Sequence, residues 1–229
     1  MKKYLAEAIG TFTLVFLGCG TAMRVGCDAA FGGGYVLTAM AFGLVIIAMA
    51  YSIGNFSGCH INPAVSLGLL LSGRMEMKDF PFYVIAQCIG SFIASAFLVA
   101  IFALGGVEDL TGGVGANGLA GVNGNFFAGL LVEVILTFIF MIAILGVTDP
   151  KFKYRQVSGL VIGFTLMLVH ILGIGLTGTS VNPARSLGPA IFAAIINHDA
   201  SSILQLPVFI IGPMAGAALA SIVYGILKD

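Results

Sequence analysis

The sequence predicts an all-α membrane protein with six transmembrane helices and two half-helices. Three observations predict it: the composition, the lengths of the apolar segments, and two copies of an Asn-Pro-Ala motif. Of the 229 residues, 59% are hydrophobic and 9% are charged, whereas soluble domains carry about 25% charged residues. Basic and acidic residues number 10 each. The chain therefore has no excess positive charge to attract nucleic acid phosphates, and we expect no nucleic acid partner.

The apolar segments fall into two length classes. A helix needs about 20 residues to cross a bilayer, and six segments reach that length, at about 4–24, 35–54, 81–104, 126–147, 157–175 and 204–227. The first follows a short basic head, but Glu7 interrupts it, so we interpret it as a retained span and not as a signal peptide. Two segments, at about 62–72 and 182–194, are only half as long, and each begins at Asn-Pro. Neither is long enough to cross the bilayer alone.

The basic residues indicate the orientation, because Lys and Arg in short loops stay on the cytoplasmic side. Eight of the ten fall on one side of a six-span arrangement: Lys2, Lys3, Arg74, Lys78, Lys151, Lys153, Arg155 and Lys228. Arg24 and Arg185 fall on the other side. The sequence therefore predicts a multi-pass protein with both termini in the cytoplasm.

The two halves of the chain are repeats. Glu7 matches Glu133 at an offset of 126 (133 − 7), and Asn62 matches Asn182 at an offset of 120 (182 − 62). Each half contains three spans, an odd number, so the second copy is inverted in the membrane. We expect a single transmembrane domain with inverted repeats of about 1–104 and 126–229, separated by a Gly-rich outer segment. Inverted repeats with short, broken apolar segments at matching positions point to a transport site near the midplane.

The Asn-Pro-Ala motifs have a direct physical interpretation. Asn is a favoured N-cap and Pro a favoured first helical residue, so Asn62 and Asn182 each cap a half-helix. Two half-helices from opposite faces would meet at their N-termini, which carry about half a positive charge each and repel cations. If the Asn oxygen caps the helix, its NH2 group remains a free donor toward the pore. The predicted pore waist comprises Asn62, Pro63, Ala64, Asn182, Pro183 and Ala184. A duplicated structural turn without a pore is the alternative.

The stretches HINPAV (residues 60–65) and SVNPARS (180–186), in a duplicated six-span chain, resemble the aquaporin family, most closely its bacterial, water-selective aquaporin Z type. The resemblance covers essentially the whole chain. It implies a passive water channel that excludes protons and ions, with water as permeant and lipid around it. It also implies a homotetramer in the cell (inner) membrane, with no catalytic residue, cofactor or metal.

The resemblance further implies an outer selectivity filter of Phe42, His170, Thr179 and Arg185. Arg185 would supply donors and a fixed charge, and Thr179 a backbone carbonyl. The glycerol-conducting branch usually carries glycine in place of His170 and an acidic residue in place of Ser186. These differences favour water, with a facilitator of glycerol or ammonia as the alternative.

Other residues are expected to support the loops. In the family, glutamates matching Glu7 and Glu133 accept hydrogen bonds from the signature-loop backbones, and His60 is expected to brace its own loop. Cys59 lies 120 positions before Thr179 and is therefore its counterpart in the first repeat. Because the repeats are inverted and Thr179 is expected at the outer constriction, we expect Cys59 at the cytoplasmic pore entrance.

Two other function classes have less support in the sequence. A secondary transporter would need a titratable midplane site, for which only the paired glutamates qualify. An intramembrane enzyme would need a nucleophile–base pair or a metal cluster, and the scattered His60, His170 and His198 provide neither.

Overall fold

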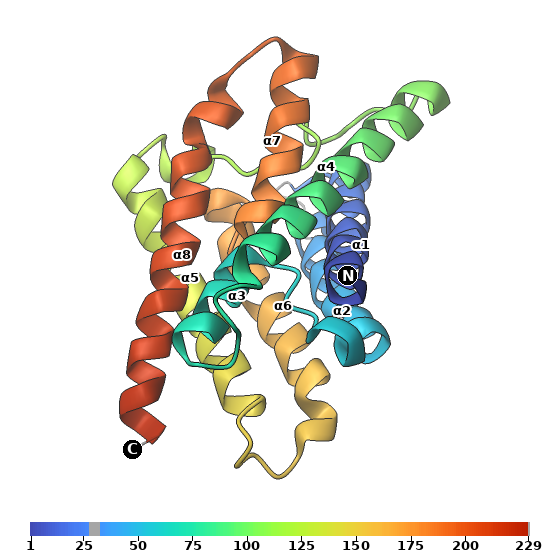
Figure 1. Ribbon diagram of the computed structural model, residues 1–229. Coiled ribbons are helices and arrows are strands. Elements are labelled where there is room, and N and C mark those ends of the chain that lie inside the picture. Colours follow the sequence, from blue (N-terminus) through green and yellow to red (C-terminus); the bar gives the residue numbers. More distant parts are fainter. Residues whose placement is uncertain (28–32, 229) are drawn as a thin grey trace.

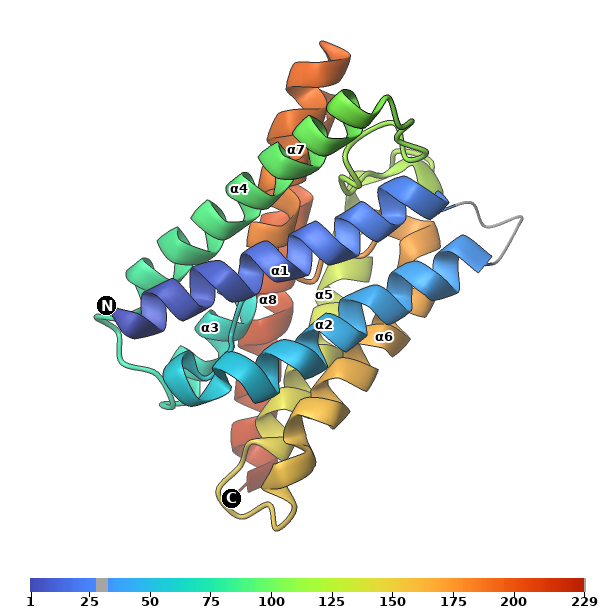
Figure 2. The same cartoon turned by 90° about the vertical axis from the view of Figure 1, so that its right-hand side faces the viewer.

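A computed structural model describes residues 1–27 and 33–228 (Figures 1 and 2). In this part of the chain the α-helices are α1 (Lys2–Val25), α2 (Gly33–Ser57), α3 (Pro63–Leu71), α4 (Phe80–Gly105), α5 (Phe126–Val147), α6 (Ser158–Thr177), α7 (Pro183–Asn197) and α8 (Ser201–Lys228). Among the same residues, the 3-10 helices η2 (Ala120–Val122) and η3 (Arg155–Val157) lie in the connections. Six of the described helices are long and apolar enough to cross a membrane, and η3 extends α6 within one of these spans. The predicted all-α class with six spans and two half-helices is confirmed.

The half-helices α3 and α7 lie end to end, with α3 below α7 in Figure 1. Their N-caps are Asn62 and Asn182, and a proline follows each cap. Asn62 Oδ1 accepts a hydrogen bond from Ala64 N at 2.8 Å, and Asn182 Oδ1 accepts one from Ala184 N at 3.1 Å. The capping role expected for both asparagines is therefore present.

Close helix contacts occur where glycines face a neighbouring backbone. A Cβ atom on Gly43 of α2 would lie 2.6 Å from Gly163 O of α6. A Cβ on Gly90 of α4 would collide with Ala8 O of α1, and one on Gly216 of α8 would collide with the backbone of α5. Small residues let membrane helices approach in this way, since the lipid supplies no hydrophobic drive for association.

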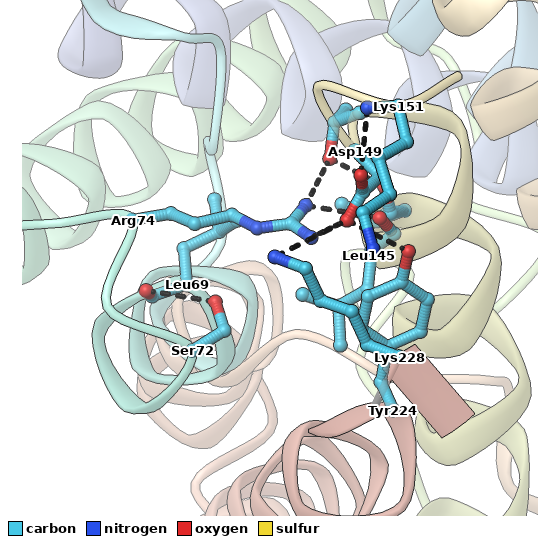
Figure 3. A network of polar contacts seen from close by, with 10 residues as sticks. Leu69, Ser72, Arg74, Leu145, Asp149, Lys151, Tyr224 and Lys228 are labelled. Atoms are coloured by element: carbon cyan, nitrogen blue, oxygen red, sulfur yellow. Dashed lines mark hydrogen bonds and ion pairs between the residues drawn. The ribbon is translucent and has the colours of Figure 1, made fainter. Parts of the chain in front are cut away.

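A polar network ties four chain segments together on one side of the bundle, which we call the inner face. It comprises the N-terminal end of α1, residues 72–79, residues 148–157 and the C-terminal end of α8. Lys3 Nζ pairs with Asp79 Oδ2 at 2.6 Å. Arg74 Nη2 and Lys228 Nζ both approach Asp149 Oδ2, at 2.9 and 3.6 Å (Figure 3). Both ends of the described chain therefore lie on the same side of the bundle.

The pKa of Asp149, which lies outside the spans, is held below its usual value, first by the backbone N–H of Lys151 and then by the Tyr224 hydroxyl and the charges of Lys228 and Arg74. A carboxyl whose pKa is lower in the folded state stabilises the fold above its unfolded pKa of about 3.9 and loses that contribution as the pH falls through the folded value. We expect Asp149→Asn to lower the melting temperature by a constant few degrees from about pH 8 to about pH 5.

The difference between this variant and the wild type should shrink below about pH 4, because the wild-type carboxyl then becomes neutral as well. Melting curves in detergent across this pH range measure it. Glu108→Gln, which changes an exposed carboxylate of the outer segment, is the control and should match the wild type. A difference that grows on acidification contradicts the assignment.

Candidate pore

Three cavities follow one another through the bundle. The outer vestibule has a volume of about 440 Å³ and is lined by Arg185, Cys27 and the segment around Gly115. The inner vestibule has a volume of about 420 Å³ and is lined by Cys59, His60 and Arg74, among others. Between them, the constriction leaves about 10 Å³ for a water-sized sphere, which is about the room of one water molecule.

The constriction is continuous with both vestibules through shared lining residues. Arg185 lines the outer vestibule and the constriction, and His60 lines the constriction and the inner vestibule. Asn62 and Asn182 line the constriction between them. The other predicted waist residues, Pro63, Ala64, Pro183 and Ala184, are buried. The narrow part of the path therefore extends from Arg185 to His60.

The two signature loops are joined by reciprocal hydrogen bonds. Asn62 Nδ2 donates to Val181 O at 2.7 Å, and Asn182 Nδ2 donates to Ile61 O at 2.9 Å. The expectation that each NH2 group is wholly free for the permeant is therefore wrong. One N–H of each is used by the opposing loop, because that loop's carbonyl is an acceptor within reach in a setting without bulk water. The second N–H of each remains available to the cavity that both asparagines line.

Both loops carry strained backbone at matching positions. Cys59 and Ile61 have φ of 54° and 41°, and Thr179 and Val181 have φ of 47° and 45°. Left-handed backbone is unfavourable for β-branched residues such as Ile61 and Val181, and each such residue costs about 1–3 kcal/mol. The surrounding structure must therefore hold the loops in place.

Two fully buried glutamates hold them. Glu7 accepts from His60 N at 2.9 Å and from Ile61 N at 2.6 Å. Glu133 accepts from Ser180 N at 2.9 Å and from Val181 N at 2.8 Å. The resemblance implied such bonds from the signature-loop backbones to these two glutamates. His60 Nδ1 lies 3.1 Å from Ser66 Oγ in α3, a contact within its own loop and half-helix.

The constriction combines an acceptor with a donor. His170 Nδ1 lies 2.9 Å from Leu166 O, and since a carbonyl can only accept, Nδ1 carries the hydrogen. In the neutral ring Nε2 is then an acceptor. His170 Nε2 and Arg185 Nε are both buried and have no hydrogen-bond partner in the described part of the chain. A water molecule, which donates and accepts, complements this pair.

The four predicted filter residues are placed differently from one another. Phe42 stacks on His170 with ring centroids 4.5 Å apart, and the Arg185 guanidinium carbon lies 5.1 Å from the centre of the Phe42 ring. These three line the constriction. Thr179 is fully buried, and its side chain packs against Gly173 of α6. The side chain therefore supports the wall of the constriction from behind and does not line it.

Sequence reasoning missed two amides. Gln87 of α4 donates from Nε2 to Glu7 Oε2 at 2.7 Å and to Ser66 Oγ at 3.1 Å. The sequence could have indicated Gln87, because a lone amide in an apolar span is costly and usually marks a functional or supporting site. Asn117, in the outer segment, accepts from Arg185 and Ser186. No pattern in the Gly-rich segment indicated that it folds back onto the constriction.

A helical membrane bundle that encloses two vestibules joined by a constriction with room for about one water molecule has the architecture of a channel. The chain belongs to the major intrinsic protein family, whose model matches residues 1–224. It is 41% identical to aquaporin Z of Rhodopseudomonas palustris over 230 residues, covering 99% of this chain and 93% of that protein. It is also 41% identical to aquaporin Z of Brucella melitensis, covering 98% and 96%.

A solved structure shows the same fold. The aquaglyceroporin of Plasmodium falciparum matches with a TM-score of 0.82 and 24% identity, covering 97% of this chain and 94% of that one. The chain is thus an aquaporin-type channel, and members of its family are transporters and not enzymes.

Proposed function

We propose that this protein is a passive, water-selective channel that excludes ions and protons. The observation that carries the proposal is the constriction, with room for about one water molecule and a wall that pairs the Arg185 donor with the His170 acceptor. The stacked rings of Phe42 and His170 form another part of its wall. A water molecule fits this room and this chemistry better than glycerol, whose three carbons need more space.

The charge around the constriction favours neutral permeants. Arg185 is 3% exposed and carries a full positive charge, and the N-termini of α3 and α7 add about half a charge each. A cation at this point meets repulsion without bulk water to screen it, whereas water does not. Exclusion of protons and cations by an arginine and half-helix dipoles is the general account for aquaporin-type pores.

In the part of the chain that the structure describes, no residue in the spans offers the free titratable site that a secondary transporter would need. Glu7 and Glu133 are its candidate titratable groups, but each already accepts three hydrogen bonds, two of them from a signature-loop backbone. Proteoliposome swelling separates the two classes. A channel gives fast water flow with a low activation energy and no dependence on proton or sodium gradients.

The selectivity is tested by stopped-flow swelling of proteoliposomes with water and then with glycerol. We expect the wild type to pass water and nearly to exclude glycerol. His170→Gly removes the imidazole from the constriction, and we expect it to raise glycerol permeability about tenfold or more, since size discrimination rests on close contacts. A wild type that passes glycerol as readily as water refutes strict water selectivity and favours the small-solute facilitator.

Mercurial block tests the inner end of the pore. Cys59 is half-buried and lines the inner vestibule next to His60. We expect thiol-reactive mercurials to reduce water permeability about tenfold or more, because an adduct next to a constriction with room for about one water molecule obstructs the path. Cys59→Ser should abolish the block. Cys27→Ser, which removes a half-buried thiol of the wide outer vestibule, is the matched control and should remain blocked; an unchanged block in Cys59→Ser refutes the assignment.

The orientation, repeats and assembly complete the proposal. The inner face, which carries both ends of the described chain and most basic residues, is proposed to face the cytoplasm of a cell (inner) membrane. The proposed inverted repeats, about 1–104 and 126–229, account for the matching contacts of Glu7 and Glu133. We propose a homotetramer with a pore in each protomer, in line with the family.

A further inference from the structure

A side cavity lies next to the outer vestibule and outside the path of the permeant. Its volume is about 420 Å³, and its walls come from the outer ends of α1, α4 and α7 and from the outer segment between α4 and α5. The apolar side chains of its lining are Met23, Val99, Phe102, Ala103, Val114 and Ile196. From Gly106 to Val99 the cavity follows α4 for about 10 Å, at 1.5 Å per residue. It therefore reaches from the helix end into the level of the spans.

One stretch of the outer segment separates this side cavity from the outer vestibule. Thr111 and Gly115 line the vestibule, whereas residues 112–114, which lie between them in the chain, line the side cavity. The wall between the two cavities is here a single stretch of chain. One side of it meets the water of the vestibule, and the other side meets the apolar cavity.

The backbone of this wall is satisfied from within the protein. Val114 N donates to Asp109 Oδ2 at 2.6 Å, and Gly112 N donates to Asp109 O at 2.9 Å. Gly112 O accepts from Asn197 Nδ2 at 2.7 Å. Asp109 and Asn197 are the polar side chains of the cavity lining, and both are used by the wall. Irregular backbone next to lipid needs its hydrogen bonds to be made in this way, so the wall is suited to an apolar neighbour.

The surface around the side cavity is apolar and exposed. Leu104 and Ile101 of α4 are 89% and 49% exposed, and Ile195 of α7 is 60% exposed. Water in a cavity with this lining would find few hydrogen-bond partners, and an unfilled cavity would lose the packing contacts of its lining. In a bilayer, the apolar groups that are available to fill it are the acyl chains of lipids.

A basic residue lies at the edge of the same region. Arg24, in the last turn of α1, is exposed and directly follows Met23 of the cavity lining. Gly20, one turn earlier, faces α4, since a Cβ added to it would lie 2.8 Å from Leu98. Residues four apart share a helix face, so Arg24 also lies toward α4. A guanidinium there complements the phosphate of a lipid head group.

We propose that the side cavity binds one acyl chain of a phospholipid from the leaflet on the side of the outer vestibule, and that Arg24 pairs with the phosphate of that lipid. The chain lies between α4, α7 and the outer segment. It packs against the wall of residues 112–114 and supports that wall from the side opposite the vestibule.

The test is photo-crosslinking in proteoliposomes with a phospholipid that carries a diazirine in one acyl chain, followed by mass spectrometry of the labelled peptides. We expect label on residues 99–114. Ala103→Trp places an indole in the cavity and should lower this label about fivefold or more, because a clash built into a site rejects its occupant. The matched control is Ala100→Trp, which adds the same side chain at an exposed position of α4 outside the cavity lining. Its label should equal that of the wild type.

Competition tests the head group. An unlabelled phospholipid should compete for the label about threefold better than a diacylglycerol with the same chains, because only the phospholipid offers a phosphate to Arg24. Arg24→Gln should remove this difference. Equal label in Ala103→Trp and Ala100→Trp overturns the site, as does protection of residues 99–114 by another copy of the chain. A preference for the phospholipid that persists in Arg24→Gln overturns the role of Arg24.

Discussion

Glu133→Gln is expected to lower the free energy of unfolding by about 3 kcal/mol, one of the largest single effects in this molecule. Glu133 Oε1 accepts from Thr177 Oγ1 and Ser180 N, and Oε2 accepts from Val181 N. A carboxamide has one acceptor oxygen, so at least one buried donor faces an NH2 group. An unsatisfied buried donor costs about 1–3 kcal/mol, and the strained backbone of the loop then loses part of its support.

Denaturant titration in detergent micelles measures the loss. The equivalent change in the first half, Glu7→Gln, should give a loss of similar size, because Glu7 also accepts three hydrogen bonds. The control is Glu76→Gln, since Glu76 pairs with Lys78 while both side chains are exposed. Exposed pairs contribute about 0–1 kcal/mol, so a loss at Glu76 equal to that at Glu133 would contradict the assigned role.

Gly216→Ala is expected to destabilise the protein by about 3 kcal/mol or to prevent folding. An added Cβ would collide with Val134 O of α5 and would lie 3.0 Å from Phe138 N. Overpacking usually costs about 1–3 kcal/mol, and here the obstacle is backbone, which has no alternative rotamer. The helices α5 and α8 would have to separate.

The same helix contains a matched control. Gly225 of α8 has nothing within 4 Å of an added Cβ, so Gly225→Ala should be neutral or stabilising by up to about 1 kcal/mol, as alanine favours helix. The yield of folded protein and the unfolding free energy of the two variants decide the matter. Equal behaviour of Gly216→Ala and Gly225→Ala would show that the α5–α8 contact tolerates a methyl group.

The helices could be predicted because their causes are local. Apolar runs of membrane length fix the six spans, and the Asn-Pro start fixes where α3 and α7 begin. The predicted helix ends were less accurate, since helix ends depend on capping and contacts. The helix α7 extends to Asn197, beyond the expected 194, and α8 begins at Ser201, before the expected 204.

The parts of the site that could not be predicted depend on contacts between distant segments. Asn117 and Arg185 are 68 positions apart, and Arg74 and Asp149 are 75 apart. Nothing in a Gly-rich segment specifies the surface onto which it folds. The left-handed backbone at Ile61 and Val181 could not be predicted from the sequence either. β-branched residues disfavour this conformation, and only the tertiary hydrogen bonds to Glu7 and Glu133 impose it.

The reciprocal bonds between the signature loops impose an order on the protein's synthesis. A ribosome that has made the first half has already supplied Glu7 and Gln87, so much of the setting of the first loop is present. The acceptor of Asn62 Nδ2, however, is Val181 O, 119 residues later in the chain. The first loop therefore remains incomplete, with an unpaired amide at membrane depth, until translation has passed the second motif. Neither of the two reciprocal bonds between the loops can therefore form before the second motif has been made.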